Sequence, residues 1–290
     1  MKTESYFEIG SSHDVCQDFA LTGKINDEIY FAIVADGCTE SHKRSGEADF
    51  GARILSYSAR EALRDMLVGS RNLSSVQLNI PDFNKILRDR ILNSANKVGQ
   101  LLKLSEFFAD STLAIVVTDG NIANTFIYGD GGIIVYKRNG DIVYREVSFL
   151  SSAPYYLMYT VNKERNDGYK IQFGASPAVI TTYLFHGVDV DAQQANEVIN
   201  TIDETIYDHT ASTFDDFLSI SVTSDGIKSY DKMGTPILSS DLAKKFIAFK
   251  NQNNGFLQRR FNFLKKEHKE ENVTHYDDVS VATVLLSTTQ

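Results

Sequence analysis

The first forty residues contain three short apolar runs with the spacing of β-strands. They are "YFEIG", "VCQDFALTG" and "EIYFAIVADG", and the turn-forming "KIND" separates the last two. Apolar runs bounded by turn residues predict strands, and two consecutive runs joined by a short turn predict a hairpin.

After Ser45 the apolar period changes to three or four residues, which is typical of a helix. The expected inward face is narrow and made of small residues. Its positions are Ala48, Gly51, Ala52, Leu55, Ala59, Leu63 and Met66. Beyond the polar "GSRNLSS", a second helix is expected from about Asp82 to Phe108. Its predicted inward positions are Ile86, Ile91, Leu92, Val98, Leu101 and Leu102.

From Ser111 onward the pattern again indicates strands. The runs are "STLAIVVTDG", "NIANTFIYGD", "GIIVYKRNG" and "DIVYREVSF", and their ends carry turn residues. "PYYLMYTV", "YKIQFG" and "AVITTYLF" continue the strand pattern, and another strand is expected at Phe217 to Val222. Two helices, Ser240 to Phe249 and Phe256 to Lys269, precede a last strand, "VSVATVLL".

Helices and strands are grouped along the chain and do not alternate. This order favours the α+β class, with helices stacked on antiparallel sheets. The chain has only four prolines and no fixed repeat, low-complexity tract or Pro-rich linker. We therefore expect residues 1–290 to form a single domain.

Composition narrows the function classes. With 42% hydrophobic and 23% charged residues, the chain is typical of a globular protein, and its formal net charge of -9 argues against a general nucleic-acid binder. The N-terminal "MKTESYFEIG" lacks the apolar segment of a secretion signal, and runs such as "LAIVV" are too short to cross a membrane. Cys16 and Cys38 are too few for a disulfide framework. We expect a cytoplasmic monomer without membrane or nucleic-acid partners.

Acidic residues recur at the tips of apolar strands, often followed by glycine. The positions are Asp18 in "VCQDFAL", Asp36 in "FAIVADG", Asp130 in "TFIYGDG", Asp225 in "SVTSDG" and Asp277 before "DVSVATVLL". Asp-Gly is also a common turn dipeptide, and any single instance is more often a hairpin corner than a metal ligand. If the strand tips converge, however, the carboxylates crowd one cleft.

Crowded carboxylates resist joint ionisation and are commonly neutralised by a multivalent cation. An all-oxygen set suits Mg²⁺ or Mn²⁺ better than Zn²⁺. Two such ions about 3.5–4 Å apart can hold a bridging water and clamp a phosphoryl group for in-line attack. A phosphoryl-transfer site is therefore one hypothesis for this cleft.

Six motifs carry a family resemblance. "SSHDVCQDFA", "VADGCTESHKRSGE", "DSTLAIVV", "IYGDGG", "SVTSDGIKSY" and "YDDVSVATVLL" resemble, in sequence and in order, the metal-dependent protein serine/threonine phosphatases of type 2C. The likeness runs from about Ser11 to Leu286, and "CQD" and "ADGC" are most similar to the compact bacterial branch.

The resemblance implies a four-layer α-β-β-α sandwich, with two antiparallel sheets flanked by helix pairs. It implies a Mg²⁺ or Mn²⁺ binuclear centre at one edge, whose bridging water hydrolyses phosphoserine or phosphothreonine on a protein without a phosphoenzyme. On the family's pattern Asp36 bridges both ions and Gly37 offers its carbonyl. Asp225 and Asp277 complete one metal, and Asp18 binds directly or through water.

Several positions depart from the family's pattern. Asp130 stands in "GDG" where the family has "GDS" and matches a third, weaker metal position, which Ser229 weakens further by replacing an Asp. His13 stands where the family has the Arg that grips the phosphate; it could donate to a phosphate oxygen, act as general acid, or be structural. Gln17 replaces a common Glu, and Arg44 is a candidate substitute for the missing Arg.

Three hypotheses follow. The first is a protein phosphatase, favoured by the joint presence of Asp36, Asp225 and Asp277. The second is an inactive module of the same fold that binds a phosphoprotein, favoured by the departures at His13 and Ser229. The third is a hydrolase of small phosphoesters.

Overall fold

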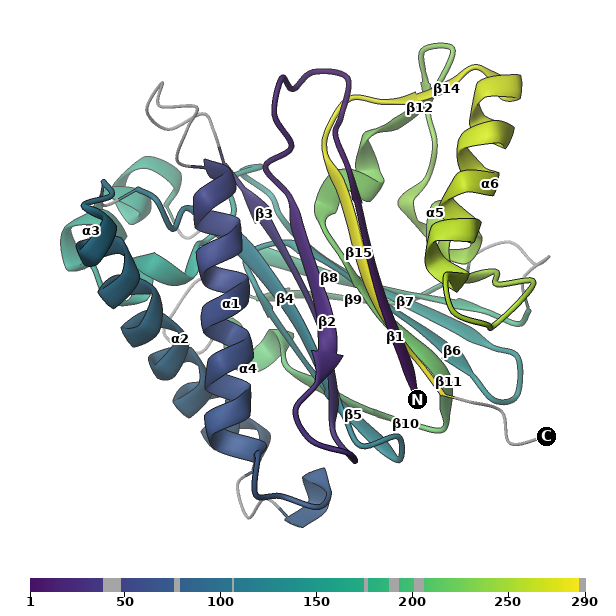
Figure 1. Ribbon diagram of the computed structural model, residues 1–290. Helices are drawn as coiled ribbons and strands as arrows, with labels where there is room; N and C mark the ends of the chain where they lie inside the picture. The colour runs from purple at the N-terminus through teal and green to yellow at the C-terminus, as the bar shows by residue number, and fades with distance from the viewer. Residues whose placement is uncertain are drawn as a thin grey trace.

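The computed structural model describes residues 1–38, 48–75, 79–105, 107–174, 177–187, 193–200 and 206–286. Two packed antiparallel sheets form its centre (Figure 1). The larger sheet contains, in spatial order, β1 (Lys2–Glu8), β15 (Val279–Leu285), β11 (Phe217–Thr223), β6 (Gly131–Lys137), β7 (Ile142–Phe149), β8 (Ala178–Phe185) and β9 (Gln193–Asn200). The smaller contains β10 (Ser212–Asp215), β5 (Ile122–Tyr128), β4 (Ser111–Thr118), β3 (Tyr30–Gly37) and β2 (Phe19–Lys24).

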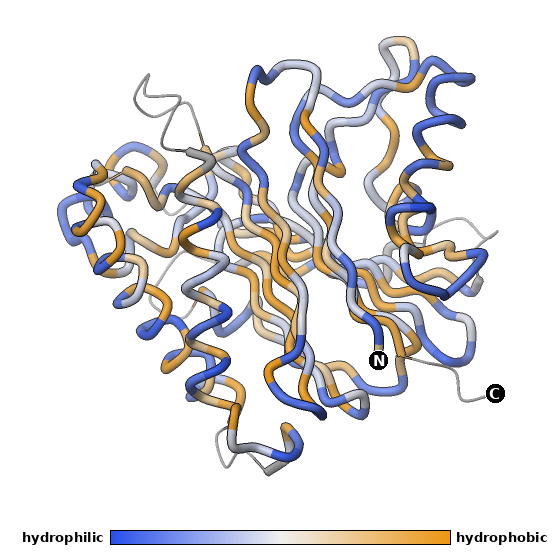
Figure 2. Tube along the Cα trace, in the orientation of Figure 1, coloured by the Kyte–Doolittle hydropathy of each residue, from blue (hydrophilic) through white to orange (hydrophobic). Residues whose placement is uncertain are grey.

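Helices cover the outer face of each sheet. The helices α1 (Ala48–Leu67) and α2 (Ile80–Leu102) pack on the smaller sheet, and α5 (Ser239–Ile247) and α6 (Phe256–Glu271) pack on the larger one (Figure 1). The expected α-β-β-α sandwich of the α+β class is thus confirmed. Figure 2 shows the hydrophobic residues concentrated along the central strands, with hydrophilic residues on the outward faces of the helices.

Burial explains why the strand pattern was visible in the sequence. All eight residues of β4 are buried, because this central strand has α1 on one side and the larger sheet on the other. A strand covered on both faces is expected to be a continuous apolar run. In α6, Phe261 and Leu264 are buried as expected, and most of the charged residues of the helix are exposed.

The small-residue face of α1 also has a physical cause. The segment between α2 and β4 passes close to this helix, and a Cβ added at Gly51 would lie only 1.7 Å from the carbonyl oxygen of Phe108. Ala52 and Ala59 are fully buried on the same helix. Larger side chains at these positions would separate α1 from the sheet.

Three expectations about local structure were wrong. The segments "PYYLMYTV" and "YKIQFG" are not strands but contain the 3₁₀ turn η2 (Leu157–Thr160) and the helix α3 (Lys163–Phe173). The helix α2 ends at Leu102, not at Phe108, since Lys103 adopts a left-handed conformation with φ 55°. Leu101 and Leu102 therefore do not face inward and are 81% and 51% exposed.

Short elements complete the architecture. A third sheet has the order β13 (Thr235–Pro236), β12 (Tyr230–Lys232), β14 (Val273–His275). The remaining turns and helix are η1 (Leu73–Ser75), α4 (Ile206–Thr210) and η3 (Asp225–Ser229). Among the helices in the described ranges, none combines the length and apolarity that a membrane crossing requires.

Candidate active site

The strand topology brings the acidic tips to one edge of the sandwich. The strands β6, β11 and β15 are neighbours in the larger sheet. Asp130 immediately precedes β6, Asp225 follows β11 at the start of η3, and Asp277 precedes β15. Because adjacent strands are antiparallel, the start of β6, the end of β11 and the start of β15 lie at the same edge.

The smaller sheet contributes from the other side. Asp36 and Gly37 are the last residues of β3, and Asp18 immediately precedes β2. The two strands pair with Phe19 opposite Ala35, which sets Asp18 beside Asp36. Asp18 was expected inside a strand and instead ends the loop before one.

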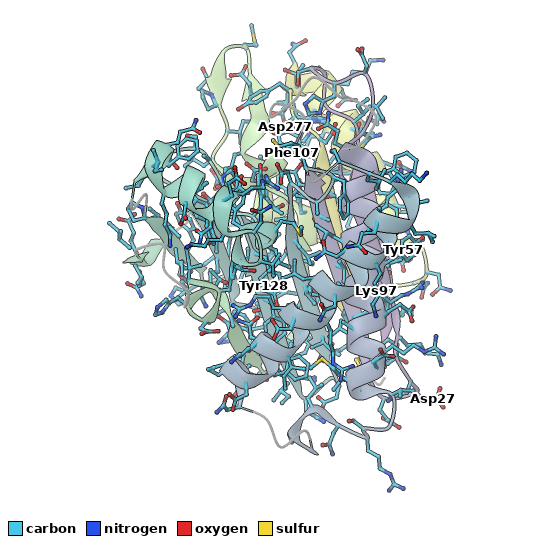
Figure 3. The ribbon with its side chains drawn as sticks, turned by 90° about the vertical axis from the view of Figure 1, so that its left-hand side faces the viewer. Asp27, Tyr57, Lys97, Phe107, Tyr128 and Asp277 are labelled. Carbon is cyan, nitrogen blue, oxygen red and sulfur yellow. The ribbon has the colours of Figure 1, made fainter. Side chains whose placement is uncertain are left out.

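The acidic tips from both sheets line one cleft of about 250 Å³, which we call the acid cleft. Its described lining residues are His13, Gln17, Asp36, Gly37, Cys38, Thr112, Asp130, Ser152, Pro154, Tyr156, Asp225 and Asp277. Figure 3 labels Asp277 at this end of the molecule and Asp27 at the opposite end. Of the predicted site residues, Asp18 lies behind the cleft with 1% of its surface exposed, and Arg44 lies outside the described residues.

Burial and mutual repulsion dominate the electrostatics of the acid cleft. Asp36 keeps part of its surface open to the cleft, yet the surrounding protein, followed by the charges of Asp18, Asp225 and Asp277, raises its pKa well above the usual range. Burial and then the Asp225 carboxylate likewise raise the pKa of Asp130 and of Asp277. The crowded carboxylates therefore favour the binding of either protons or a cation.

Asp18 provides a direct test of whether these residues fit a metal. Burial raises its pKa to about 7, although Ser280, Asp36 and Ser224 are near enough to oppose the rise. Neither carboxylate oxygen of Asp18 has a hydrogen-bond partner of acceptable geometry. Buried carboxylates without partners are rare unless they coordinate cations. The all-oxygen donor set thus fits Mg²⁺ or Mn²⁺.

The side chains do not form a closed ligand set. Within the part of the chain that the structure describes, no three His, Cys, Asp or Glu side chains converge with the spacing of a metal site. The fit therefore depends on the chemistry of the donors and on the buried, unpartnered Asp18. The metal ions themselves stay a prediction.

The neighbouring residues Asp277 and Asp278 have different environments. Asp277 lines the acid cleft, whereas Asp278 is 1% exposed and accepts hydrogen bonds from the backbone N–H groups of Gly10 at 2.7 Å and Gln17 at 2.6 Å. These bonds clamp both ends of the loop that carries His13. The structural role of Asp278 was missed because its partners lie far away in the sequence.

His13 lies between the acid cleft and the segment of Asp277 and Asp278. It lines the acid cleft, and its Nε2 lies 3.8 Å from Oδ1 of Asp277. Its Nδ1 lies 3.1 Å from Oδ2 of Asp278, but without the geometry of a hydrogen bond. His13 thus lies beside two carboxylates and lines the cleft.

The third sheet and one glycine hold Asp225 against the Asp277 segment. A Cβ added at Gly226 would lie 1.7 Å from the carbonyl oxygen of Asp278, so only glycine permits this approach. Ser229, which replaces an expected Asp, donates to the carbonyl oxygen of Gly226 at 2.7 Å and is buried. Ser229 therefore stabilises the turn and does not line the cleft.

Other residues of the site were not predicted. Tyr156 lines the acid cleft from the turn before η2, a segment that the sequence pattern assigned to a strand. Lys228 lies beside Asp130 and Asp225 with its Nζ 3.6 Å from Oε1 of Glu146, and these acids outweigh burial and raise its pKa. It places a positive charge behind the acidic cluster.

Comparison with known proteins identifies a family whose model spans part of this site. A family model described as Protein phosphatase 2C matches residues 10–168, which include His13, Asp18, Asp36 and Asp130. A search of curated proteins gives no significant match.

Solved structures share the fold at low identity. A bacterial serine phosphatase is 10% identical, with a TM-score of 0.53 over 100% of this chain and 99% of that one. Serine/threonine phosphatase Stp1 from Staphylococcus aureus is 11% identical, with a TM-score of 0.52 over 99% of this chain and 95% of that one. The Mycobacterium tuberculosis serine/threonine phosphatase PstP/Ppp is 11% identical, with a TM-score of 0.50 over 99% of each chain.

The family model covers more than half of the chain, and the structural likeness covers nearly all of it. The expectation of a protein phosphatase is thereby confirmed, and the chain belongs to the protein phosphatase 2C family.

Proposed function

We propose that the acid cleft hydrolyses phosphoserine and phosphothreonine on proteins in a metal-dependent reaction. One observation carries this proposal: acidic residues from the tips of strands in both sheets line a single cleft, with the unpartnered Asp18 buried behind it. Since both sheets contribute, we also propose that residues 1–290 act as one functional unit.

The donors that would hold two ions are the carboxylates of Asp36, Asp225 and Asp277 with the carbonyl of Gly37. Asp18 would support Asp36 directly or through water. When bound, Mg²⁺ or Mn²⁺ supplies Lewis-acid stabilisation of the phosphoryl oxygens and lowers the pKa of water, so that hydroxide is available as the nucleophile near neutral pH. Asp130 would support a third, weaker position.

The chain's own groups bind and orient the phosphate. His13 offers a ring N–H donor at the cleft, and the Asp278 clamp on Gly10 and Gln17 fixes the loop that carries it. Such a donor favours one orientation of the phosphoryl oxygens, which raises the fraction of productive encounters. The cleft is open, with the Asp277 side chain 36% exposed, so a phosphorylated side chain can enter from a protein surface.

A second candidate is a phosphoprotein-binding module without turnover. It is favoured by the absence of a closed ligand set among the described residues and by the engagement of Ser229 with the Gly226 carbonyl. A hydrolase of small phosphoesters would use the same cleft.

The test is hydrolysis of p-nitrophenyl phosphate and of a phosphothreonine peptide, with Mn²⁺, with Mg²⁺ and with EDTA. Asp36→Asn is the site variant. Asp27→Asn is the matched control, because Asp27 has a 92% exposed side chain at the far end of the molecule (Figure 3). Metal-dependent turnover that Asp36→Asn abolishes and Asp27→Asn retains supports the enzyme.

Other outcomes discriminate the alternatives. Turnover of the small ester alone identifies a small-phosphoester hydrolase. Phosphopeptide binding without turnover in any metal supports the binding module. Turnover that persists in EDTA contradicts the proposed metal dependence.

A further inference from the structure

A second cavity opens beside the acid cleft. It has a volume of about 500 Å³, within the range of roughly 300–1,000 Å³ that is usual for ligand pockets. The helix α3, the turn η2 and the segment before β4 form its walls. We call it the aromatic pocket because its described lining includes Phe107, Tyr156, Tyr159, Tyr169 and Phe173.

The aromatic pocket adjoins the acid cleft. Cys38, Ser152, Pro154 and Tyr156 line both cavities. One extended peptide, which rises about 3.3 Å per residue, could therefore place a phosphate in the acid cleft and a nearby side chain in the aromatic pocket.

The lining of the aromatic pocket has no net charge. Nη2 of Arg165 lies 2.6 Å from both carboxylate oxygens of Asp110, and the two side chains are 11% and 2% exposed. The Arg165 guanidinium also stands 4.7 Å from the ring centre of Phe107 and 4.9 Å from that of Tyr159. A ligand cation would be repelled by the Arg165 guanidinium, which already occupies these ring faces. A ligand anion would be repelled by the neighbouring carboxylates of the acid cleft.

The aromatic side chains of the pocket wall pack on one another. The rings of Tyr159 and Tyr169 have centroids 5.2 Å apart, and those of Tyr169 and Phe173 are 4.9 Å apart. The Tyr169 hydroxyl donates to the carbonyl oxygen of Ala153 at 2.6 Å. A well-packed aromatic wall with no net charge favours an apolar side chain, because binding then requires little ordering of the pocket.

We propose that the aromatic pocket receives an apolar side chain of the phosphoprotein substrate, close in sequence to the phosphorylated residue. This inference rests on the proposed function and deepens it, because it defines which phosphorylated segments the acid cleft selects. Phosphorylated segments with an aromatic or large aliphatic neighbour are the preferred substrates.

The test uses phosphothreonine peptides that differ at one position, from three residues before to three after the phosphothreonine. That position carries Phe, Ser, Arg or Asp. The expected result is a kcat/KM at least about tenfold higher for Phe than for the other residues at one position, from the burial of one aromatic side chain. Affinities of non-hydrolysable phosphonate versions of the same peptides are measured in parallel with Mn²⁺.

A blocking variant follows from Gly168, which lines the aromatic pocket on α3. A Cβ added there would have no heavy atom within 4 Å, so Gly168→Leu can add a bulky side chain at the exposed rim of the pocket. The preference for Phe should fall below about threefold in Gly168→Leu. Ile171→Ala is the control, because Ile171 is 85% exposed on the same helix and does not line the pocket.

Each outcome settles the inference separately from the proposed function. Turnover without a preference for Phe, or with a preference that Gly168→Leu leaves intact, overturns the pocket inference and leaves the phosphatase standing. A binding preference that Gly168→Leu removes, in a chain without turnover, upholds the pocket inference and overturns the proposed catalysis. Equal affinity for all phosphonate peptides overturns the inference whether or not turnover occurs.

Discussion

The carboxylate of Asp278 accepts a 2.6 Å hydrogen bond from the backbone N–H of Gln17, across 261 positions of sequence. The same carboxylate accepts a 2.7 Å bond from Gly10. Two charge-assisted bonds to a buried carboxylate join the first loop of the chain to the acid cleft.

Asp278→Ala should therefore reduce the free energy of unfolding by about 2–4 kcal/mol, because it leaves two buried N–H donors without partners. Urea unfolding measures this loss. Asp14→Asn is the control on the same loop, since Asp14 is exposed, and its effect should stay within about 0.5 kcal/mol. Equal effects of the two variants would contradict the clamp.

Asp36→Asn should have opposite effects on activity and on stability. Turnover should fall by more than the roughly 10–100-fold that changes around a metal ligand produce. Without metal, removing one charge from the crowded carboxylates should raise the free energy of unfolding by about 1 kcal/mol. Turnover assays and urea unfolding in EDTA measure the two effects, and a destabilised Asp36→Asn in EDTA would argue against carboxylate repulsion.

Manganese should stabilise the wild-type chain. At 100 times its dissociation constant, a ligand that binds only the folded state adds about 2.7 kcal/mol. A thermal melt with increasing Mn²⁺ measures this, and the rise in melting temperature should be largely lost in Asp36→Asn and kept in Asp27→Asn. An equal rise in all three proteins would show that Mn²⁺ binds elsewhere.

Glu8 should make stability depend on pH in the acid range. Burial alone favours its neutral form, but His275, the Tyr6 hydroxyl at 2.6 Å and Lys265 at 2.9 Å lower its pKa to about 2. Because the unfolded chain has the higher pKa, about 4.3, this stabilisation is complete above that pH and is lost as pH falls toward 2.

Glu8→Gln measures that contribution. The variant should be about 2 kcal/mol less stable than wild type at pH 6, after allowance for the partly exposed side chain, and the difference should shrink between about pH 4.5 and pH 2. Urea unfolding at several pH values is the measurement, with the exposed Glu28→Gln as control. If the difference in the free energy of unfolding between Glu8→Gln and wild type does not change with pH, the stabilisation by an ionised Glu8 is refuted.

Gly226→Ala and Gly168→Ala should change the free energy of unfolding in opposite directions. A Cβ at Gly226 would lie 1.7 Å from the backbone oxygen of Asp278, so we expect a loss of more than about 3 kcal/mol and lower turnover. The same change at Gly168 meets open space on a helix and should add up to about 1 kcal/mol. Thermal melts of the two variants compare them directly.

The apolar pattern predicted helices stacked on antiparallel sheets because the central strands are covered on both sides, whereas the four-layer sandwich was implied by the family resemblance. The apolar runs of β3 and β4 and the spacing along α1 follow directly from that burial. The segments "PYYLMYTV" and "YKIQFG" were assigned wrongly because aromatic residues favour strands in general. Here Tyr155, Tyr159 and Tyr169 pack on one another, and Asn162 caps α3 by accepting from the N–H of Arg165.

The acidic residues of the site could be predicted from short stretches of sequence, but the residues that position them could not. Asp36, Asp130 and Asp225 lie at the ends of apolar runs, and this pattern is visible in a short window of sequence. The clamp by Asp278 and the presence of Tyr156 at the cleft depend on contacts between distant segments. Which residue replaces the phosphate-binding Arg stays a prediction, because Arg44 lies outside the described residues and His13 is only one candidate.

The position of β15 has a consequence for how the chain is made. This strand follows all other described strands in sequence, yet it lies between β1 and β11 in the larger sheet. While the ribosome is still synthesising the preceding residues, β1 and β11 lack their shared neighbour and present unpaired edges. Contacts this far apart in sequence form slowly. A nascent chain therefore cannot bring Asp277 to Asp36 until β15 has emerged, and phosphatase activity should begin only after that strand has docked.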